Sequence, residues 1–177
     1  MSEESTLTEL LKESPFQQLF DLSCTRLERT KGEVEIVMGY TASVERSPGS
    51  RQYHGGAIAS LIDIAGDYAL WAMLGYGVPT INFRIDYLRP ASDTNLRAQA
   101  RVRKAGRTVG VVDIDVLDDQ GRLVAIGRGT YGTKEGKLRR QRLRALAASS
   151  ASAFSGRLSS LCVEATGNSS TTTNARG

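Results

Sequence analysis

The stretch GGAIASLIDIAGDYALWAML, roughly Gly55–Leu74, decides the fold of this 177-residue chain. Its apolar residues go nearly all the way round a helix, and such a helix is typically buried rather than lying on a surface. Ser60, Asp63 and Asp67 interrupt the apolar run, which argues against a membrane span. We therefore expect one long helix at the centre of a single domain.

Segments on both sides of this helix alternate between apolar and polar residues, as half-buried strands do. Two segments precede the helix, joined by a turn that ends in glycine, and four follow it. The short connections favour antiparallel meander pairing. The sequence thus predicts an α+β fold, in which an antiparallel sheet of about six strands wraps around one central helix. The expected strands are Cys24–Glu28, Glu33–Tyr40, Thr80–Leu88, Leu96–Lys104, Thr108–Val116 and Leu123–Tyr131.

Residues 1–14 and 15–133 form the first two parts of the chain. The first part holds a short helix over Thr6–Glu13, with Thr6 as N-cap and Glu9 three residues later, in the pattern of a capping box. The second part is the domain in which the sheet wraps around the central helix.

The third part, residues 134–177, carries the positive charge. Its net charge is +6, so residues 1–133 carry −2 of the total of +4. After a short basic helix over Lys137–Ala148 we expect this Ser- and Thr-rich tail to be disordered. The charge suits nucleic acid or an acidic surface, but Phe154 is the only aromatic residue of the tail, which disfavours base stacking. A solvated extension is the simpler interpretation, and no nucleic-acid partner is expected.

The composition also disfavours several classes of protein. The chain does not open with a basic segment and an apolar run, so we expect no secretory signal and a cytoplasmic protein. Cys24 and Cys162 lie far apart, and His54 is the only histidine, so neither a disulfide scaffold nor a structural zinc site is expected. We expect two free thiols, no metal and no cofactor.

The central helix carries polar groups that suit acyl transfer. His54, Gly55 and Gly56 open it, and free N–H groups at a helix start, with no side chain in the way, suit a developing oxyanion. The three polar exceptions along the helix are spaced three and four residues apart and share one face. Among them, Asp63 can act as a nucleophile or as a base on water. The solvent-exposed face of an ordinary amphipathic helix has the same pattern. The spacing alone does not decide between such a face and a catalytic site.

Two runs of sequence resemble the signature of the PaaI-type thioesterases of the hotdog superfamily. The run HGGAIASLID occupies residues 54–63, and DYLRPA occupies residues 86–91. KAGR, VDIDV and the segment that follows them continue the match in order, so that the likeness covers about residues 16–132. It implies a hotdog fold, hydrolysis of an acyl-CoA to free acid and CoA, and a homodimer that can pair into a tetramer.

The resemblance assigns roles residue by residue. Asp63 matches the catalytic carboxylate, which acts as general base or nucleophile. Gly55 matches the residue whose N–H polarises the thioester carbonyl, and His54 matches the histidine that shapes the helix start. Thr80 matches a serine that helps to place water in some members, and it would serve the Asp63 of a second subunit. Gly56 is expected to lie at the substrate.

The turn between the fourth and fifth expected strands resembles the family's CoA-binding turn. CoA carries phosphate groups, which guanidinium groups bind well, and a glycine in the turn would offer an open N–H. A solvated strand face is an equally good interpretation of these charges. The residues assigned to CoA binding are Arg103, Lys104, Gly106 and Arg107.

One departure from the family pattern leaves alternatives open. Members often carry asparagine six residues before the histidine, where this chain has Pro48, and Gln52 or Ser47 could take its place. A non-catalytic acyl-CoA-binding sensor is therefore a second hypothesis. A hotdog dehydratase is disfavoured, because His54 has no acidic partner at the spacing familiar from that class. The preferred acyl group stays open.

Overall fold

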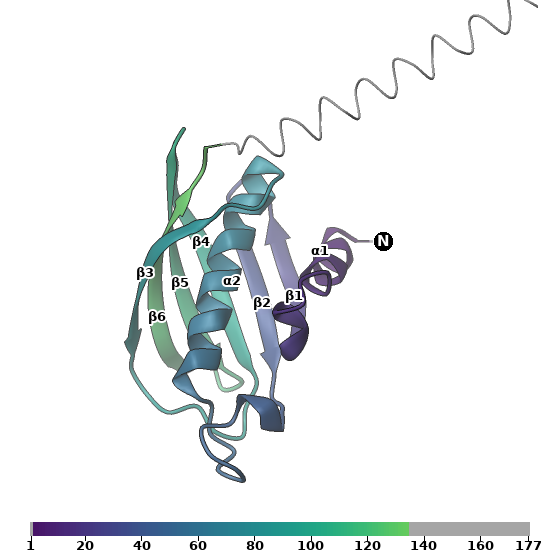
Figure 1. Ribbon diagram of the computed structural model, residues 1–177, viewed down its shortest axis with the longest axis vertical. Helices are drawn as coiled ribbons and strands as arrows, with labels where there is room; N and C mark the ends of the chain where they lie inside the picture. Colours follow the sequence, from purple (N-terminus) through teal and green to yellow (C-terminus); the bar gives the residue numbers. More distant parts are fainter. Residues whose placement is uncertain (1, 135–177) are drawn as a thin grey trace, which may run out of the picture. The chain divides into compact units, whose positions relative to one another are not determined.

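The structure is a computed structural model that describes residues 2–134. Its elements are α1 (Glu3–Leu11), the short 3-10 helix η1 (Gln17–Leu19), β1 (Asp21–Glu28), β2 (Glu33–Gly39), a second 3-10 helix η2 (Ala42–Val44), α2 (Gly55–Leu74), β3 (Thr80–Tyr87), β4 (Leu96–Ala105), β5 (Val109–Asp118) and β6 (Leu123–Gly132). The strands form one antiparallel sheet that wraps around α2 (Figure 1). The predicted hotdog architecture is confirmed. The tail from residue 135 on, with the helix expected over Lys137–Ala148, lies outside the described residues.

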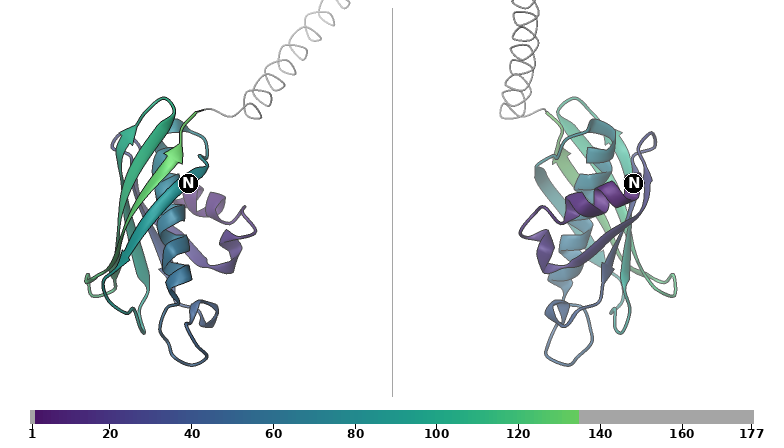
Figure 2. Two further views of the ribbon diagram at one scale, coloured as in Figure 1. Left: turned by 60° about the vertical axis from the view of Figure 1, so that its left-hand side comes forward. Right: turned by 90° about the vertical axis from the view of Figure 1, so that its right-hand side faces the viewer.

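The order of the strands places β3 at an edge of the sheet. The order is β1-β2-β4-β5-β6-β3, and within the described residues β3 pairs only with β6. The expected meander is therefore confirmed for β4, β5 and β6 and wrong for β3. The reason is that α2 runs along the inner face of the sheet (Figure 2), so the chain leaves β2 and re-enters the sheet at its far edge.

Helix α2 has the bounds that the sequence predicts. His54 caps its start, since Nδ1 of the imidazole accepts the Gly56 N–H at 2.9 Å. Gly75 ends it in the left-handed conformation, with φ of 74°, which favours glycine. The helix has the length and apolar composition of a membrane-spanning helix, but most of it is buried in the fold.

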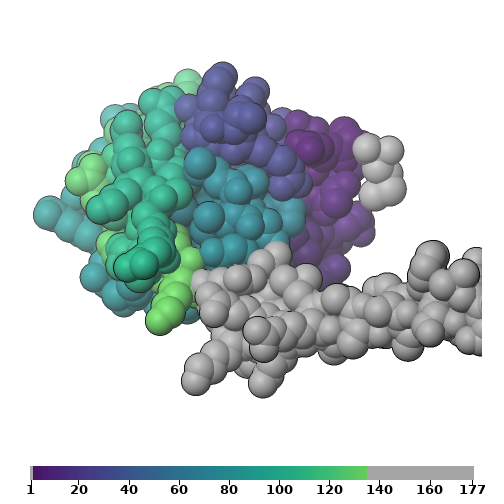
Figure 3. Space-filling view, turned by 90° about the horizontal axis from the view of Figure 1, so that it is seen from above, coloured from purple at the N-terminus to yellow at the C-terminus, as the bar shows by residue number. Residues whose placement is uncertain are grey.

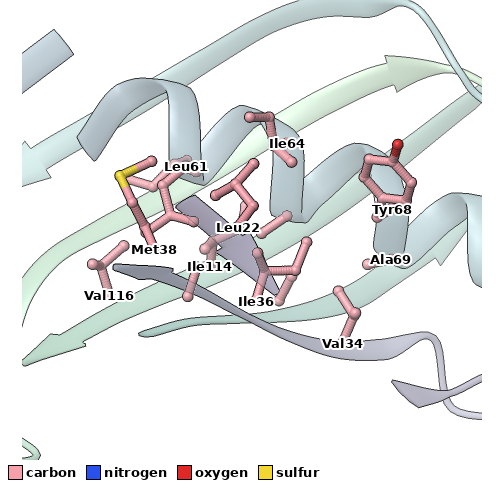
Figure 4. Close-up of a cluster of buried hydrophobic side chains, with 14 of the residues drawn as sticks. Leu22, Val34, Ile36, Met38, Leu61, Ile64, Tyr68, Ala69, Ile114 and Val116 are labelled. Carbon is pink, nitrogen blue, oxygen red and sulfur yellow. The ribbon is translucent and has the colours of Figure 1, made fainter. Parts of the chain in front are cut away.

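The core lies between α2 and the inner face of the sheet. Leu61, Ile62 and Leu70 of α2 are completely buried. They belong to one buried cluster with alternate residues of the strands, among them Val34, Ile36, Met38, Ile114 and Val116. Figure 4 shows Leu61 and these strand residues. Burial of each such side chain contributes about 1.5–3 kcal/mol. This packing fixes the helix, and with it the polar residues that the helix carries.

Helix α1 begins earlier than the sequence analysis expects. Its N-cap is Ser2, whose Oγ accepts the Ser5 N–H at 3.2 Å, so the expectation of Thr6 as N-cap is wrong. Two glutamates in the first turn favour the earlier start, because carboxylates are stabilised at a helix N-terminus. Leu7 and Leu11 are buried in the core. The N-terminal residues and the strands after residue 80 lie on opposite sides of the molecule (Figure 3).

Candidate active site

The start of α2 offers a free backbone donor. His54 takes up the next two N–H groups, because its Nδ1 accepts from Gly56 at 2.9 Å and its carbonyl accepts from Ala57 at 3.0 Å. Within residues 2–134 no acceptor contacts the Gly55 N–H. The Gly55 carbonyl is fixed by the hydroxyl of Tyr87, which donates to it at 2.8 Å. An N–H held in this way at the positive end of a helix dipole suits a carbonyl oxygen that gains negative charge.

A cleft of about 610 Å³ opens at this helix start. Gln52 lines the cleft together with His54 and Gly55, whereas Pro48 does not. Two arginines also line the cleft, and neither forms an ion pair within the described part of the chain. The cleft therefore suits a ligand with negative charge. Its lining residues are Arg46, Gln52, Tyr53, His54, Gly55, Ile58, Tyr87, Leu88, Arg89, Pro90 and Ala91.

Asp63 lies in the middle of α2, beside the first residue of β3. The Thr80 hydroxyl donates to Oδ1 of Asp63 at 2.8 Å. Both residues belong to the same chain, so Thr80 contacts its own Asp63, and the expected contact with the Asp63 of a second subunit stays a prediction. Tyr131 donates to the Asp63 main-chain carbonyl at 3.3 Å, and a Cβ on Gly66 would lie 1.9 Å from the tyrosine hydroxyl. Glycine at this position thus lets the tyrosine approach the helix and fix it behind the carboxylate.

The Gly55 N–H and the Asp63 carboxylate, the two groups expected to carry out catalysis, do not come together within one chain. Asp63 follows Gly55 by eight residues, which corresponds to about 12 Å along a helix axis. A carbonyl oxygen held by the Gly55 N–H lies about 3 Å from that nitrogen. Asp63 does not line the cleft at the helix start. The carboxylate of the same chain is therefore too far away to act on a carbonyl held there.

Asp67, one turn after Asp63, faces the connection between α2 and β3. Its Oδ1 accepts the Val78 N–H at 2.9 Å. Burial raises the pKa of Asp67 from 3.8 to about 6, the hydrogen bond from Val78 lowers it, and the nearby charge of Asp63 raises it. The sequence placed Asp67 on the polar face of α2 but gave no reason to expect this contact.

The turn expected to bind CoA lies near the opposite end of α2. Gly110, just after the turn, packs so closely on Leu70 that an added Cβ would lie 2.8 Å from the leucine side chain. Arg103 Nε is bound to Asp113 Oδ2 at 2.7 Å. Lys104 and Arg107 are exposed. The turn is thus far from the Gly55 of its own chain, and the CoA-binding role of Arg103, Lys104, Gly106 and Arg107 stays a prediction.

Cys24 is unsuited to nucleophilic catalysis. Its thiol is buried, and burial raises its pKa to about 11. It is therefore protonated at neutral pH, whereas a nucleophilic cysteine must be a thiolate. In residues 2–134 no group of three or more His, Cys, Asp and Glu side chains is arranged to hold a metal ion.

Arg46, which precedes α2, is one cleft residue that the sequence analysis missed, and Tyr87 and Arg89 are two more. The last two lie in the run DYLRPA, which carried the resemblance but received no role of its own. The structure brings this run to the start of α2, where both residues line the cleft. An exposed tyrosine and arginine at the end of a strand are a recognisable sign of binding, and this sign could have identified them.

Comparison with known proteins identifies the family. The thioesterase superfamily matches residues 53–125, from the cleft beside α2 into β6. A putative esterase of Halobacterium salinarum is 36% identical over 115 residues, which cover 59% of this chain and 76% of the relative. The chain belongs to the thioesterase superfamily. This thioesterase is also similar to the acyl-coenzyme A thioesterase PaaI of Escherichia coli, with 38% identity over 95 residues that cover 52% of this chain and 66% of PaaI.

Solved structures agree with this membership. A crystal structure of a protein from the thioesterase superfamily is 32% identical, with a TM-score of 0.68, over 73% of this chain and 96% of that protein. The E. coli PaaI structure is 26% identical, with a TM-score of 0.65, over 76% and 96% of the two chains. This chain is accordingly a thioester hydrolase with the hotdog fold.

Proposed function

We propose that this thioesterase hydrolyses an acyl-CoA thioester to a free acid and CoA, in a site that two copies of the chain share. In this proposal Asp63 of one copy acts on a carbonyl that Gly55 of the other copy holds. The observation that carries it is the separation of about 12 Å between the two residues along α2. The acyl-CoA substrate is supported by the likeness to PaaI, an acyl-coenzyme A thioesterase.

The chemistry follows from the groups at the two positions. The Gly55 N–H donates to the thioester carbonyl oxygen and binds it more strongly as negative charge develops. Asp63 either attacks the carbonyl carbon or takes a proton from the water that attacks it. The C–S bond breaks, CoA leaves as a thiolate that takes up a proton, and water supplies the new oxygen of the acid. Thr80 holds Oδ1 of Asp63 at 2.8 Å, so that Oδ2 is available for the reaction.

The cleft at the helix start supports a CoA ester as substrate. Arg46 and Arg89 would face the negative charges of CoA, which guanidinium groups bind through paired hydrogen bonds. Gln52 would supply the amide that Pro48 cannot. Since the turn around Gly106 lies near the far end of α2, it would serve the cleft of another copy and not that of its own chain.

The edge strand β3 supports pairing between two copies. Within residues 2–134 this strand has a neighbour on one side only. It carries three exposed apolar side chains, namely Ile81 (56% exposed), Phe83 (39%) and Tyr87 (52%). An exposed apolar edge strand is a template for pairing with another strand. Antiparallel pairing of two β3 strands would set the two α2 helices antiparallel, and would bring Asp63 of each copy toward Gly55 of the other. Tetramers would then form from such dimers.

Positive charge introduced on the edge strand β3 is expected to dissociate the proposed dimer. In Ile81→Lys/Phe83→Lys, like charges would face each other across the two-fold axis, where they are destabilising. We expect sedimentation at the monomer mass and at least about a tenfold loss of activity. Leu19→Lys is the control, because Leu19 is 62% exposed but precedes β1, at the opposite edge of the sheet. A double variant that stays dimeric, or a monomer that keeps full activity, would contradict the shared site.

The substrate class is tested with a panel of short, long and aromatic acyl-CoA esters, in which CoA release is followed with a thiol-reactive chromophore. We expect turnover of at least one ester, with kcat in the usual enzymatic range of about 1–10³ per second. Tight binding of the esters without turnover would instead favour the acyl-CoA-binding sensor. Neither binding nor turnover would mean that CoA esters are the wrong class of substrate.

A further inference from the structure

We infer that Asp67 is a positioning residue, which holds the segment before β3 so that Thr80 reaches Asp63. The inference rests on the proposed function, because it assumes that Asp63 and Thr80 carry out the reaction. Asp67 itself would contact neither substrate nor water in the reaction. Its effect would pass entirely through the backbone between Val78 and Thr80.

Two hydrogen bonds attach the short segment from Val78 to Thr80 to one face of α2. Asp63 and Asp67 are four residues apart on α2, so their side chains are neighbours. Asp67 Oδ1 accepts the Val78 N–H at 2.9 Å, and Asp63 Oδ1 accepts the Thr80 hydroxyl at 2.8 Å. Proline, which restricts the backbone, occupies the position between Val78 and Thr80. Movement of Val78 away from α2 would therefore carry Thr80 with it.

The far side of this segment is also fixed. The Gly132 N–H donates to the Pro79 carbonyl at 2.8 Å, and the Tyr76 hydroxyl donates to the Thr133 carbonyl at 2.8 Å. These contacts join the segment to the end of β6. Asp67 is the group that joins it to α2, and α2 is the element that carries Asp63. Tyr131 of β6 also donates to the Asp63 main-chain carbonyl at 3.3 Å, so the distance between Thr80 and Asp63 depends on Asp67 together with the tether to β6.

The surroundings of Asp67 indicate that its carboxylate is kept at a cost in stability. The ionisable groups that face it are Asp63 on the same helix, Tyr68 one residue on and Tyr131 from β6. No cation in the described residues is among the groups that shift its pKa, which burial raises to about 6. A neutral side chain would avoid this penalty. A partly buried charge that weakens the fold is more typical of a functional site than of a solvated helix face.

A double-mutant cycle tests whether Asp67 acts through Thr80. We expect Asp67→Ala to lower kcat about tenfold with little change in KM, because small displacements of catalytic groups cost rate. Thr80→Val, which keeps the shape and removes the hydroxyl, is expected to have a similar effect. The double variant should then be no slower than Thr80→Val alone. Effects that multiply to about a hundredfold, or an Asp67→Ala enzyme with unchanged kcat, would overturn the inference.

Asp67→Asn separates positioning from chemistry. The amide oxygen still accepts the Val78 N–H, so we expect kcat within about threefold of the wild type. The folded state raises the pKa of Asp67 from 3.8 to about 6, so burying its charge costs stability in full above pH 6 and less as the pH falls through this range. The cost is almost gone at about pH 3, where the group is mostly protonated in both states. The Asn variant should therefore melt at a higher temperature than the wild type at pH 7 and at nearly the same temperature at about pH 3. An Asn variant as slow as the Ala variant would show that the charge takes part in the reaction, which refutes a positioning role.

A measurement without substrate keeps this inference distinct from the proposed function. Amide hydrogen exchange at Val78, whose N–H is bound to Asp67, reports whether the segment is held on α2. We expect fast exchange in Asp67→Ala and wild-type protection in Asp67→Asn. If the wild type hydrolysed no CoA ester, the proposed function would fail while the exchange result could still stand. Equal protection in both variants would overturn the role of Asp67 whatever the activity.

Discussion

Asp63→Asn is expected to lower kcat for thioester hydrolysis by about 10²- to 10⁴-fold, the range that general base catalysis contributes. The amide keeps the shape of the side chain and the contact with Thr80, which lies 2.8 Å from Oδ1. It can neither take a proton from water nor attack a carbonyl carbon. Because the thioester would still bind, KM should change little. Rates of CoA release at saturating substrate measure the effect.

Ser60→Ala is the matched control for Asp63→Asn. Ser60 lies on the same polar face of α2, its hydroxyl donates to the Gly56 carbonyl at 2.9 Å, and we assign it no part in the reaction. We expect near wild-type kcat for this variant. A folded Asp63→Asn enzyme that keeps more than about a tenth of the wild-type kcat would remove Asp63 from the chemistry.

Gly55→Pro is expected to cost about 10²- to 10³-fold in kcat, because it removes the one N–H that we assign to the oxyanion. Proline is tolerated at the first position of a helix. The backbone before it is suitable, since His54 has ψ of 138°, in the extended region that a residue before proline prefers. The variant should therefore fold with an intact α2, which circular dichroism can verify, and lose most of its thioesterase activity.

Gly55→Ala is the control for the proline variant, because it keeps the N–H and adds only a methyl group. An added Cβ would lie 3.4 Å from the ring of Tyr87, which is an ordinary contact. We expect its kcat to stay within a few fold of the wild type. If the alanine and proline variants were equally slow, the space at this position and not the N–H would be what matters.

The elements that the sequence predicted best are those defined by local pattern. Helix α2 was predicted with its observed bounds, because its apolar run lies between HGG and Gly75. The N-terminal helix was predicted with the wrong start, since Ser2 and Thr6 are both good caps and the local sequence does not choose between them. The edge position of β3 was missed, because strand order depends on where α2 delivers the chain and not on any pattern within the strand.

The sequence predicted the individual site residues but not the contacts between them. The separation of Gly55 and Asp63 follows from helix geometry alone, and the sequence already contained it. The contact between Thr80 and Asp63 within one chain could not be predicted, because it depends on how the segment after Gly75 folds back onto Asp67. The distance of the turn around Gly106 from the cleft required the topology of the sheet.

The shared site is tested most directly by mixing two inactive variants. Asp63→Asn and Gly55→Pro dimers are allowed to exchange subunits in equal amounts, and mass spectrometry verifies the exchange. In a mixed dimer one site then has both groups intact and the other has neither, so random exchange should restore about a quarter of wild-type activity. If mixed dimers form and activity stays at the level of the separate variants, Asp63 and Gly55 act within one chain, and a site shared between two copies is refuted.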